Sequence, residues 1–327
     1  MRPPEWTGDE FVEALNAPVE PPFAGSVAVL RSPPTMPEDL VRAAAARLAT
    51  LPSVVVAGPG CQPSGAGLGL VDVCAASDDQ VQDVVAGFEG SPLAAQATTL
   101  LLRGAERRSV GDGLVVESAV FSALQAGPEH TAWRRRTPRR DRPDTGASRV
   151  HVRRTAGLLE VVLARPGAAN ALDARMRDEL LEALAVAEAD PALRVEIRAE
   201  GPTFCAGGDL DEFGTAPDPA TAHVVRLRRS VGAALERVAA RVTVVIGGAA
   251  VGSGVELAAF AGRVVARPDA RFSLPELGLG LVPGAGGTVS LPRRIGRHRT
   301  AWLALTGRVV DASTARAWGL VDEIRLV

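Results

Sequence analysis

Runs of apolar residues alternate with amphipathic stretches along the second half of the chain. Residues 173–189 carry apolar side chains at helical spacing behind an acidic first residue, Asp173, and therefore predict a helix. Shorter runs, either apolar or alternating with polar positions, predict strands at residues 150–153, 158–164, 195–199 and 242–246. Because strands that alternate with helices form layered sheets, this half is predicted to be an α/β domain.

The first half of the chain follows the same order in a shorter form. The segments that match, in order, are residues 25–33 with 157–166, 37–50 with 173–189, 51–59 with 193–202, and the tetrapeptide Gly-Leu-Val-Asp at 69–72 with 319–322. Several weak matches in one order are better evidence of a repeat than any of them alone. We therefore expect an ancestral duplication in which the first copy is shortened and degenerate.

An arginine- and proline-rich stretch separates the two halves. Residues 131–149 combine seven Arg with two Pro, a Gly and little apolar content, which predicts a linker. The expected organisation is a degenerate copy at 1–72, a helical segment with the linker at 73–149, and the core at 150–327.

Composition changes this picture mainly by exclusion. The 327 residues, 46% hydrophobic and 23% charged with a net charge of -2, are typical of a soluble globular protein without a nucleic-acid partner. All 36 basic residues of the Lys and Arg class are Arg, and there is no Tyr. The chain therefore has no lysine Schiff base and no phosphate-loop lysine. Four His and three Cys at unsuitable spacings predict no metal site, and the sparse Cys predict a cytoplasmic protein. The most apolar run, 242–255, is too short and too rich in Gly to span a membrane.

Two glycine-rich segments, at 204–210 and 248–257, follow predicted strands. Small residues let a substrate approach the backbone, and amide N–H groups at the start of a helix can stabilise developing negative charge. This pattern suits an oxyanion hole, although, taken alone, it is better explained by tight strand-to-helix turns.

Two glutamates lie in apolar sequence near these segments. Glu256 ends the second glycine-rich segment, and Glu276 lies in Phe-Ser-Leu-Pro-Glu, shortly before Gly-Ala-Gly-Gly-Thr at 284–288. Burial would raise the pKa of a carboxyl group towards the range useful for proton transfer, and two neighbouring carboxyl groups can divide acid and base roles. The alternative is that each Glu caps a helix or pairs with one of the many Arg.

Taken together, these motifs resemble the crotonase superfamily, the enoyl-CoA hydratases and isomerases, over residues 150–327. The motifs that carry the resemblance are Arg-Pro-Gly-Ala-Ala-Asn-Ala-Leu at 165–172, Phe-Cys-Ala-Gly-Gly-Asp-Leu at 204–210, the glycine-rich turn before Glu256, Ser-Leu-Pro-Glu at 273–276, Pro-Gly-Ala-Gly-Gly-Thr at 283–288, and residues 307–322. The resemblance implies an α/β fold with a ββα spiral core and a helical segment. It also implies an acyl-CoA thioester substrate with no separate cofactor, and a homo-oligomer, either trimer or hexamer.

The same resemblance assigns roles to residues. It implies that the amides of Ala206 and Ser253 form the oxyanion hole, and that Glu256 and Glu276 hold a water molecule over the double bond of a 2-enoyl-CoA. Glu256 would activate the water and Glu276 would protonate Cα. The residues expected to contact substrate are Ala168, Ala171, Gly207, Gly208, Asp209, Gly252 and Gly286.

Other chemistries of the superfamily stay open: isomerisation, decarboxylation, thioester hydrolysis and cofactor-independent oxygenation. A non-catalytic subunit is the alternative from another class.

Residues 78–140 resemble the helical tail that follows the Gly-Leu-Val-Asp element in the family, so the order is effectively permuted. We expect these helices to pack on the 150–327 core, either of the same chain or of a neighbouring one. The arginines at 134–142 are either a solvated linker or the group that contacts the CoA phosphates.

Overall fold

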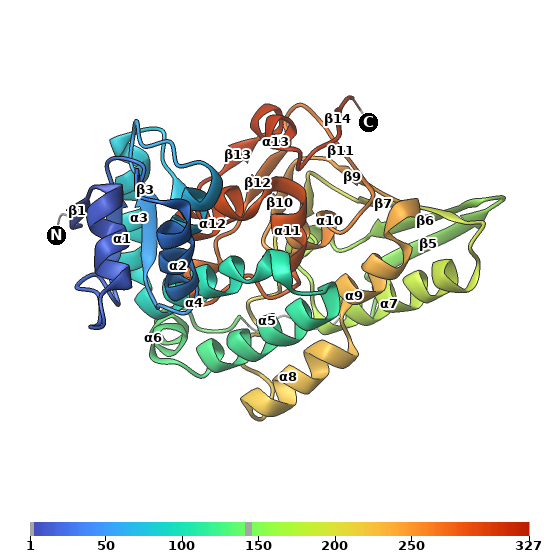
Figure 1. Cartoon of the computed structure of the whole chain (residues 1–327). Helices are drawn as coiled ribbons and strands as arrows, with labels where there is room; N and C mark the ends of the chain where they lie inside the picture. Colours follow the sequence, from blue (N-terminus) through green and yellow to red (C-terminus); the bar gives the residue numbers. More distant parts are fainter. Residues whose placement is uncertain (1–2, 141–145, 327) are drawn as a thin grey trace.

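The computed structural model describes residues 3–140 and 146–326. The N-terminal part contains a small parallel sheet in the order β1-β2-β3-β4 (Figure 1). Its strands are β1 (Glu5–Trp6), β2 (Val27–Leu30), β3 (Val54–Ala57) and β4 (Val73–Cys74). Helices α1 (Gly8–Asn16) and α2 (Glu38–Leu48) and the 3-10 helix η1 (Gly65–Leu70) complete this layer. All side chains of β2 and β3 are buried, which is usual for a parallel sheet covered on both faces.

Helices follow the small sheet and connect it to the rest of the molecule. They are α3 (Asp78–Gly90), α4 (Pro92–Arg103), η2 (Ala105–Arg107), α5 (Val110–Gln125) and α6 (Pro128–Arg136). Helices α3 and α4 contact α12 (Arg297–Thr306) of the C-terminal half, and α5 contacts α8 (Pro219–Arg228), α9 (Val231–Val238) and α11 (Gly287–Ile295). Figure 1 shows α5 running from the N-terminal part along the underside of the C-terminal half. The expectation that residues 78–140 pack on the core is met by these contacts, and they show that the packing occurs within one chain, which the sequence left open.

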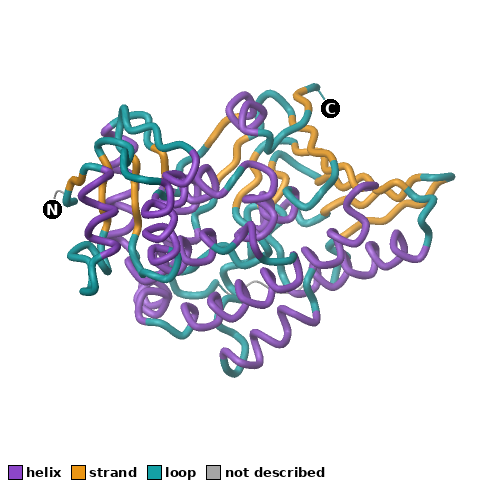
Figure 2. Tube along the Cα trace, viewed as in Figure 1, coloured by secondary structure: helices purple, strands orange, loops and turns teal. Residues whose placement is uncertain are grey.

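Two sheets form the centre of the C-terminal half, and Figure 2 shows their strands grouped on one side of the helices. The larger sheet has the order β14-β11-β9-β7-β6-β5 and is parallel except for the β5–β6 hairpin. The smaller sheet, β13-β12-β10-β8, is parallel except for β13. The strands are β5 (Val150–Thr155), β6 (Leu158–Leu163), β7 (Arg194–Ala199), β8 (Thr203–Cys205), β9 (Val242–Ile246), β10 (Ala249–Val251), β11 (Arg263–Ala266), β12 (Arg271–Ser273), β13 (Val310–Asp311) and β14 (Glu323–Ile324).

Helices of this half pack around the sheets and share their apolar core, which includes Leu159, Met176, Leu184 and Phe272. The helices are η3 (Pro166–Ala168), α7 (Ala174–Ala189), α8 (Pro219–Arg228), α9 (Val231–Val238), η4 (Ala239–Arg241), α10 (Ser253–Ala258), η5 (Glu276–Leu279), α11 (Gly287–Ile295), α12 (Arg297–Thr306) and α13 (Ala312–Trp318). The predicted strands and the predicted helix at 173–189 are confirmed within a few residues, and Asp173 is the N-cap of α7. In the part of the chain that the structure describes, no helix is long and apolar enough to cross a membrane.

The linker is shorter than the sequence predicted, because residues 131–136 belong to helix α6. Pro128 occupies the first turn of α6, where its missing N–H group costs no helical hydrogen bond. The three Arg in the last turn stabilise the helix, because their positive charges lie at the negative end of its dipole. His130 also anchors this helix, since its ring contacts the carbonyl oxygen of Leu279 at 2.9 Å. Residues 141–145 of the predicted linker lie outside the described residues.

Candidate active site

The sequence motifs converge on one hollow of the C-terminal half, which we call the main cavity. It has a volume of about 590 Å³ and is lined by Gly208, Ser253, Glu256 and Glu276 together with side chains of α5 and α8. This volume is in the range of small-molecule sites. The structure therefore brings both glutamates and both glycine-rich segments to the same wall.

The first glycine-rich segment corrects one predicted role. The amide of Ala206 donates to the carbonyl oxygen of Ala169 at 3.0 Å, so it is not free to hold a substrate oxygen. Two further backbone bonds, Leu172 N to Gly207 O and Asp209 N to Leu172 O, join the same two segments. Between these bonds the amide of Gly208 has no acceptor within the described residues. Gly208, which was expected only to contact substrate, is the free donor here.

The second segment presents another free amide. Ser253 is the first residue of α10, and an N–H group at that position has no acceptor within the helix. The N–H group of Ser253 also has no other acceptor in the described ranges 3–140 and 146–326. Gly252 precedes it with a φ of 50°, and a Cβ atom there would lie 2.2 Å from Glu276 Oε1. Glycine at 252 thus allows the turn and Glu276 to come into contact.

Glu256 is buried and held by the backbone on one side. Its Oε2 accepts the amides of Ala285 at 2.7 Å and Gly287 at 2.8 Å, and its side chain lines the main cavity. A side chain at Gly287 would collide with Glu256, because its Cβ would be 2.6 Å from Glu256 Cγ. Burial raises the pKa of Glu256 to about 7 against the opposing effect of the amides. A carboxyl group with that pKa can exchange a proton near neutral pH.

Glu276 begins η5 and is also buried. Its Oε2 is shielded from solvent and has no hydrogen-bond partner among the residues that the structure describes. Burial, and secondly the neighbouring charge of Glu256, raise the pKa of Glu276 well above its usual value. The carboxyl group is therefore suited to be a proton donor.

A third buried carboxylate, Glu117 of α5, was not identified from the sequence. Its Oε1 accepts the amide of Gly286 at 2.7 Å, and its Oε2 accepts the amide and the hydroxyl group of Thr288 at 2.8 and 2.6 Å. Four successive amides, 285 to 288, thus alternate between Glu256 and Glu117. Burial, then the charge of Glu256, raise the pKa of Glu117 to about 8, although its donors act in the opposite direction. The available signal was a lone acidic residue within the apolar stretch 113–124.

Only some of the other residues that were expected to contact substrate line a cavity. Asp209 lines the main cavity and pairs with Arg165 at 2.6 Å. A smaller hollow of about 130 Å³, which we call the side cavity, includes Gly286 in its wall. Ala168, Ala171, Gly207 and Gly252 line neither cavity, so their part is to shape the backbone around Gly208 and Ser253.

The arginine cluster lies beside the loop at 210–214, part of which lines the main cavity. Arg134 donates to the carbonyl oxygen of Leu210 at 2.5 Å, and Arg139 to that of Phe213 at 2.8 Å. Arg140 pairs with Asp211 at 3.2 Å. These guanidinium groups hold the loop, in addition to any contact with a ligand. No group of three or more His, Cys, Asp or Glu side chains in the described residues is arranged to hold a metal ion.

Comparison with known proteins gives consistent matches to the C-terminal half. Residues 153–325 match the family model described as enoyl-CoA hydratase/isomerase. The enoyl-CoA isomerase/hydratase fer4 of Mycosarcoma maydis is 35% identical over 178 residues, covering 51% of this chain and 65% of that protein. The 2,3-dehydroadipyl-CoA hydratase of Escherichia coli is 35% identical over 178 residues, covering 54% and 69%.

Solved structures agree with these relatives. The enoyl-CoA hydratase from Thermoplasma volcanium aligns with a TM-score of 0.50 and 33% identity, covering 55% of this chain and 73% of that one. The enoyl-CoA hydratase of Mycobacterium smegmatis aligns with a TM-score of 0.50 and 32% identity, covering 54% and 69%. The chain spans less than two thirds of the length of several curated relatives that it matches.

Proposed function

Because the chain belongs to the enoyl-CoA hydratase/isomerase family, the crotonase superfamily, we propose that it adds water reversibly to the double bond of a 2-enoyl-CoA thioester. The observation that carries this proposal is the pairing of two buried carboxyl groups, Glu256 and Glu276, with two free amides in one cavity. The proposed steps use protein groups and water alone, so no added cofactor is part of the proposal.

Gly208 and Ser253 are proposed to hold the thioester oxygen. When water attacks Cβ, the electron pair of the double bond moves towards the carbonyl group and negative charge develops on that oxygen. Two fixed N–H donors stabilise this charge more in the transition state than in the ground state, which lowers the barrier. The free amides of Gly208 and Ser253 support this assignment, and the occupied amide of Ala206 argues against its predicted role.

Glu256 and Glu276 are proposed to divide the proton transfers. Glu256 takes a proton from water while the water oxygen bonds to Cβ, and Glu276 gives its proton to Cα as the enolate collapses. The steps leave Glu256 protonated and Glu276 ionised, and exchange with bulk water restores both. Both pKa values are raised by burial, which supports proton exchange by the two groups near neutral pH. The unpartnered Oε2 of Glu276 supports its role as the acid, and the two amides that Glu256 accepts favour its ionised form.

The test is hydration of crotonyl-CoA, followed by the absorbance of the conjugated thioester. Glu256→Gln and Glu276→Gln should each lower kcat by about 10²- to 10⁴-fold, the usual contribution of a positioned acid or base. Glu188→Gln, an exposed change on α7, is the matched control. Wild-type rates in both site variants would overturn the proposal, and so would double-bond migration without hydration.

A further inference from the structure

The side cavity continues the main cavity beyond the reacting groups. The two hollows share Leu172, Arg177, Arg226, Gly284 and Ala285 in their walls, so they meet beside the loop that anchors Glu256. If the thioester oxygen is held by Gly208 and Ser253 and the double bond lies at the two glutamates, the rest of the acyl chain must extend past them. The side cavity is the enclosed space adjoining that point.

Arg226 of α8 lies at the junction and has unused hydrogen-bond donors. Its Nη2 donates to the Ser122 hydroxyl group at 2.7 Å, and its guanidinium group stacks over the Phe121 ring at 4.4 Å. Its Nε is buried without an acceptor, and no carboxylate of the described residues forms an ion pair with it. Burial lowers the pKa of Arg226 to about 10, which still leaves it charged at neutral pH.

Apart from Glu276, which is proposed to act on the substrate, the carboxylates around these cavities have other partners. Glu256 and Glu117 accept the amides of the 285–288 loop, Asp209 pairs with Arg165, and Glu212 accepts the amide of Ala174. The other arginine that lines both cavities, Arg177, is bonded to Asp178 at 2.9 Å. Arg226 is therefore the cation at the junction that forms no direct ion pair in the described part of the chain, and the charge of Glu117 acts on it only from beyond ion-pair distance.

From this arrangement we propose that the acyl group of the substrate ends in a carboxylate that binds Arg226. The proposal rests on the proposed function for the position of the thioester. A guanidinium group with unfilled donors in a poorly hydrated wall is costly when unpaired, and a carboxylate is the anion whose geometry matches it. The substrate class is thus a 2-enoyl-CoA with a carboxylate at the far end of the acyl chain.

The experiment compares two six-carbon substrates that differ only at that end. One is trans-2-hexenoyl-CoA, and the other is the same thioester with a terminal carboxylate in place of the methyl group. The wild-type kcat/KM should be at least about ten-fold higher for the carboxylate, as expected for one charge-assisted hydrogen bond. Arg226→Met, which keeps the aliphatic length, should lower this ratio by about ten- to a hundred-fold.

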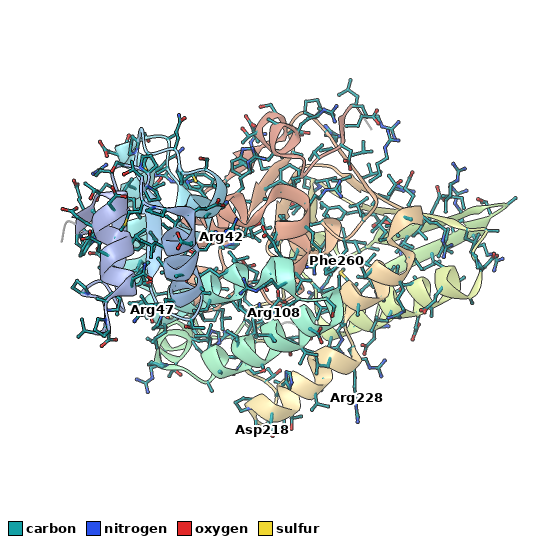
Figure 3. All side chains as sticks on the ribbon, in the orientation of Figure 1. Arg42, Arg47, Arg108, Asp218, Arg228 and Phe260 are labelled. Carbon is teal, nitrogen blue, oxygen red and sulfur yellow. The ribbon has the colours of Figure 1, made fainter. Side chains whose placement is uncertain are left out.

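Arg228→Met is the matched control, because Arg228 is exposed at the C-terminal end of the same helix (Figure 3). It should leave the ratio unchanged. Arg226→Lys should retain part of the preference, since it keeps the charge and loses the planar group. The inference would be overturned if the wild-type kcat/KM were equal for the two substrates and Arg226→Met lowered both values equally. The proposed function would still stand in that case.

Binding separates this inference from the proposed function. Calorimetry with the two saturated thioesters, hexanoyl-CoA and its carboxylate-ended analogue, needs no turnover. If neither enoyl-CoA is hydrated and the carboxylate-ended thioester still binds at least about ten-fold tighter in an Arg226-dependent way, hydration is wrong and this subsite stands. Equal binding of the two analogues, or binding of neither, would overturn the subsite.

Discussion

A single glycine sets how closely Glu276 approaches Ser253, the second of the two proposed oxyanion donors. Gly252 has a φ of 50°, and a Cβ there would lie 2.2 Å from Glu276 Oε1. Any other residue would be strained in that conformation and would displace the proposed acid. The precision of the site therefore depends on a residue that provides no functional group.

Gly252→Ala should lower kcat by about 10²-fold or more, since small displacements of catalytic groups have effects of that size. Steady-state hydration of crotonyl-CoA measures it. The control is Gly278→Ala, because a Cβ at Gly278 meets nothing within 4 Å and its φ is not positive. An active Gly252→Ala enzyme would show that Glu276 does not need this position.

The pKa of Glu256 predicts the pH dependence of the reaction. As the proposed base it must be ionised, and its pKa is raised to about 7 by burial. The value of kcat/KM should therefore fall as the pH drops through about 7. A base with the pKa of an exposed glutamate would stay ionised, and the enzyme active, down to about pH 4.3. A profile of kcat/KM against pH measures this, and an acidic limb below pH 5 would contradict the assignment.

At the scale of elements, helix α5 completes a site built by the C-terminal half. Glu117 holds the N-terminus of α11 through Gly286 and Thr288, and the same loop holds Glu256 through Ala285 and Gly287. Glu117 is thus a positioning residue, acting on Glu256 through the backbone they share.

Glu117→Gln should destabilise the protein by about 1–3 kcal/mol, because its amide nitrogen would face a backbone N–H donor and leave that buried donor without an acceptor. It should also lower kcat for crotonyl-CoA, since the loop that holds Glu256 would lose one of its anchors. Urea unfolding and steady-state hydration measure the two effects. Glu129→Gln is the control, as Glu129 also accepts two backbone amides, Leu93 and Ala94, at another helix. An unchanged kcat would reduce Glu117 to a structural role.

The hydrophobic periodicity of the sequence was sufficient to predict the helices and strands. It was not sufficient to predict which backbone amides and carboxyl groups meet in the site. The strands at 158–163 and 242–246 and helix α7 could be predicted because their hydrophobic patterns are local and visible in the sequence. The choice between Ala206 and Gly208 depends on a backbone bond to Ala169, 37 residues earlier by their numbers, and no local pattern encodes it. Glu117 was missed for the same reason, because its partners are 169 and 171 residues away.

At the scale of the molecule, a buried charge network joins the two halves. Asp72, in the Gly-Leu-Val-Asp element directly before β4 of the small sheet, pairs with Arg103 of α4 at 2.6 Å and lies 3.8 Å from Arg297 of α12. Asp72 also accepts the backbone amide of Val55 in β3. In the second copy of the element, Asp322 accepts the backbone amide of Val264 in β11 in the same way. This shared geometry supports the duplication, which stays a proposal.

Asp72→Ala should lower the free energy of unfolding by about 3–5 kcal/mol, because it leaves Arg103 buried and uncompensated. Asp322→Ala is the comparison, since Asp322 is 42% exposed and its ion pair should contribute at most about 1 kcal/mol. Urea unfolding of both variants measures the difference. Equal losses would show that Asp72 does not join the halves through buried charge.

The position of α5 ahead of the C-terminal half in the sequence also determines when the site can form during synthesis. Helix α5 leaves the ribosome long before Gly286 exists, and Arg297 reaches the carbonyl oxygen of Val71 across 226 residues. Contacts of such separation slow folding, because the chain must close long loops before it gains their energy. Until then the Glu117 carboxylate and the apolar face of α5 are exposed to water. The recovery of activity on refolding would therefore report the docking of α5, rather than the formation of any of the three sheets.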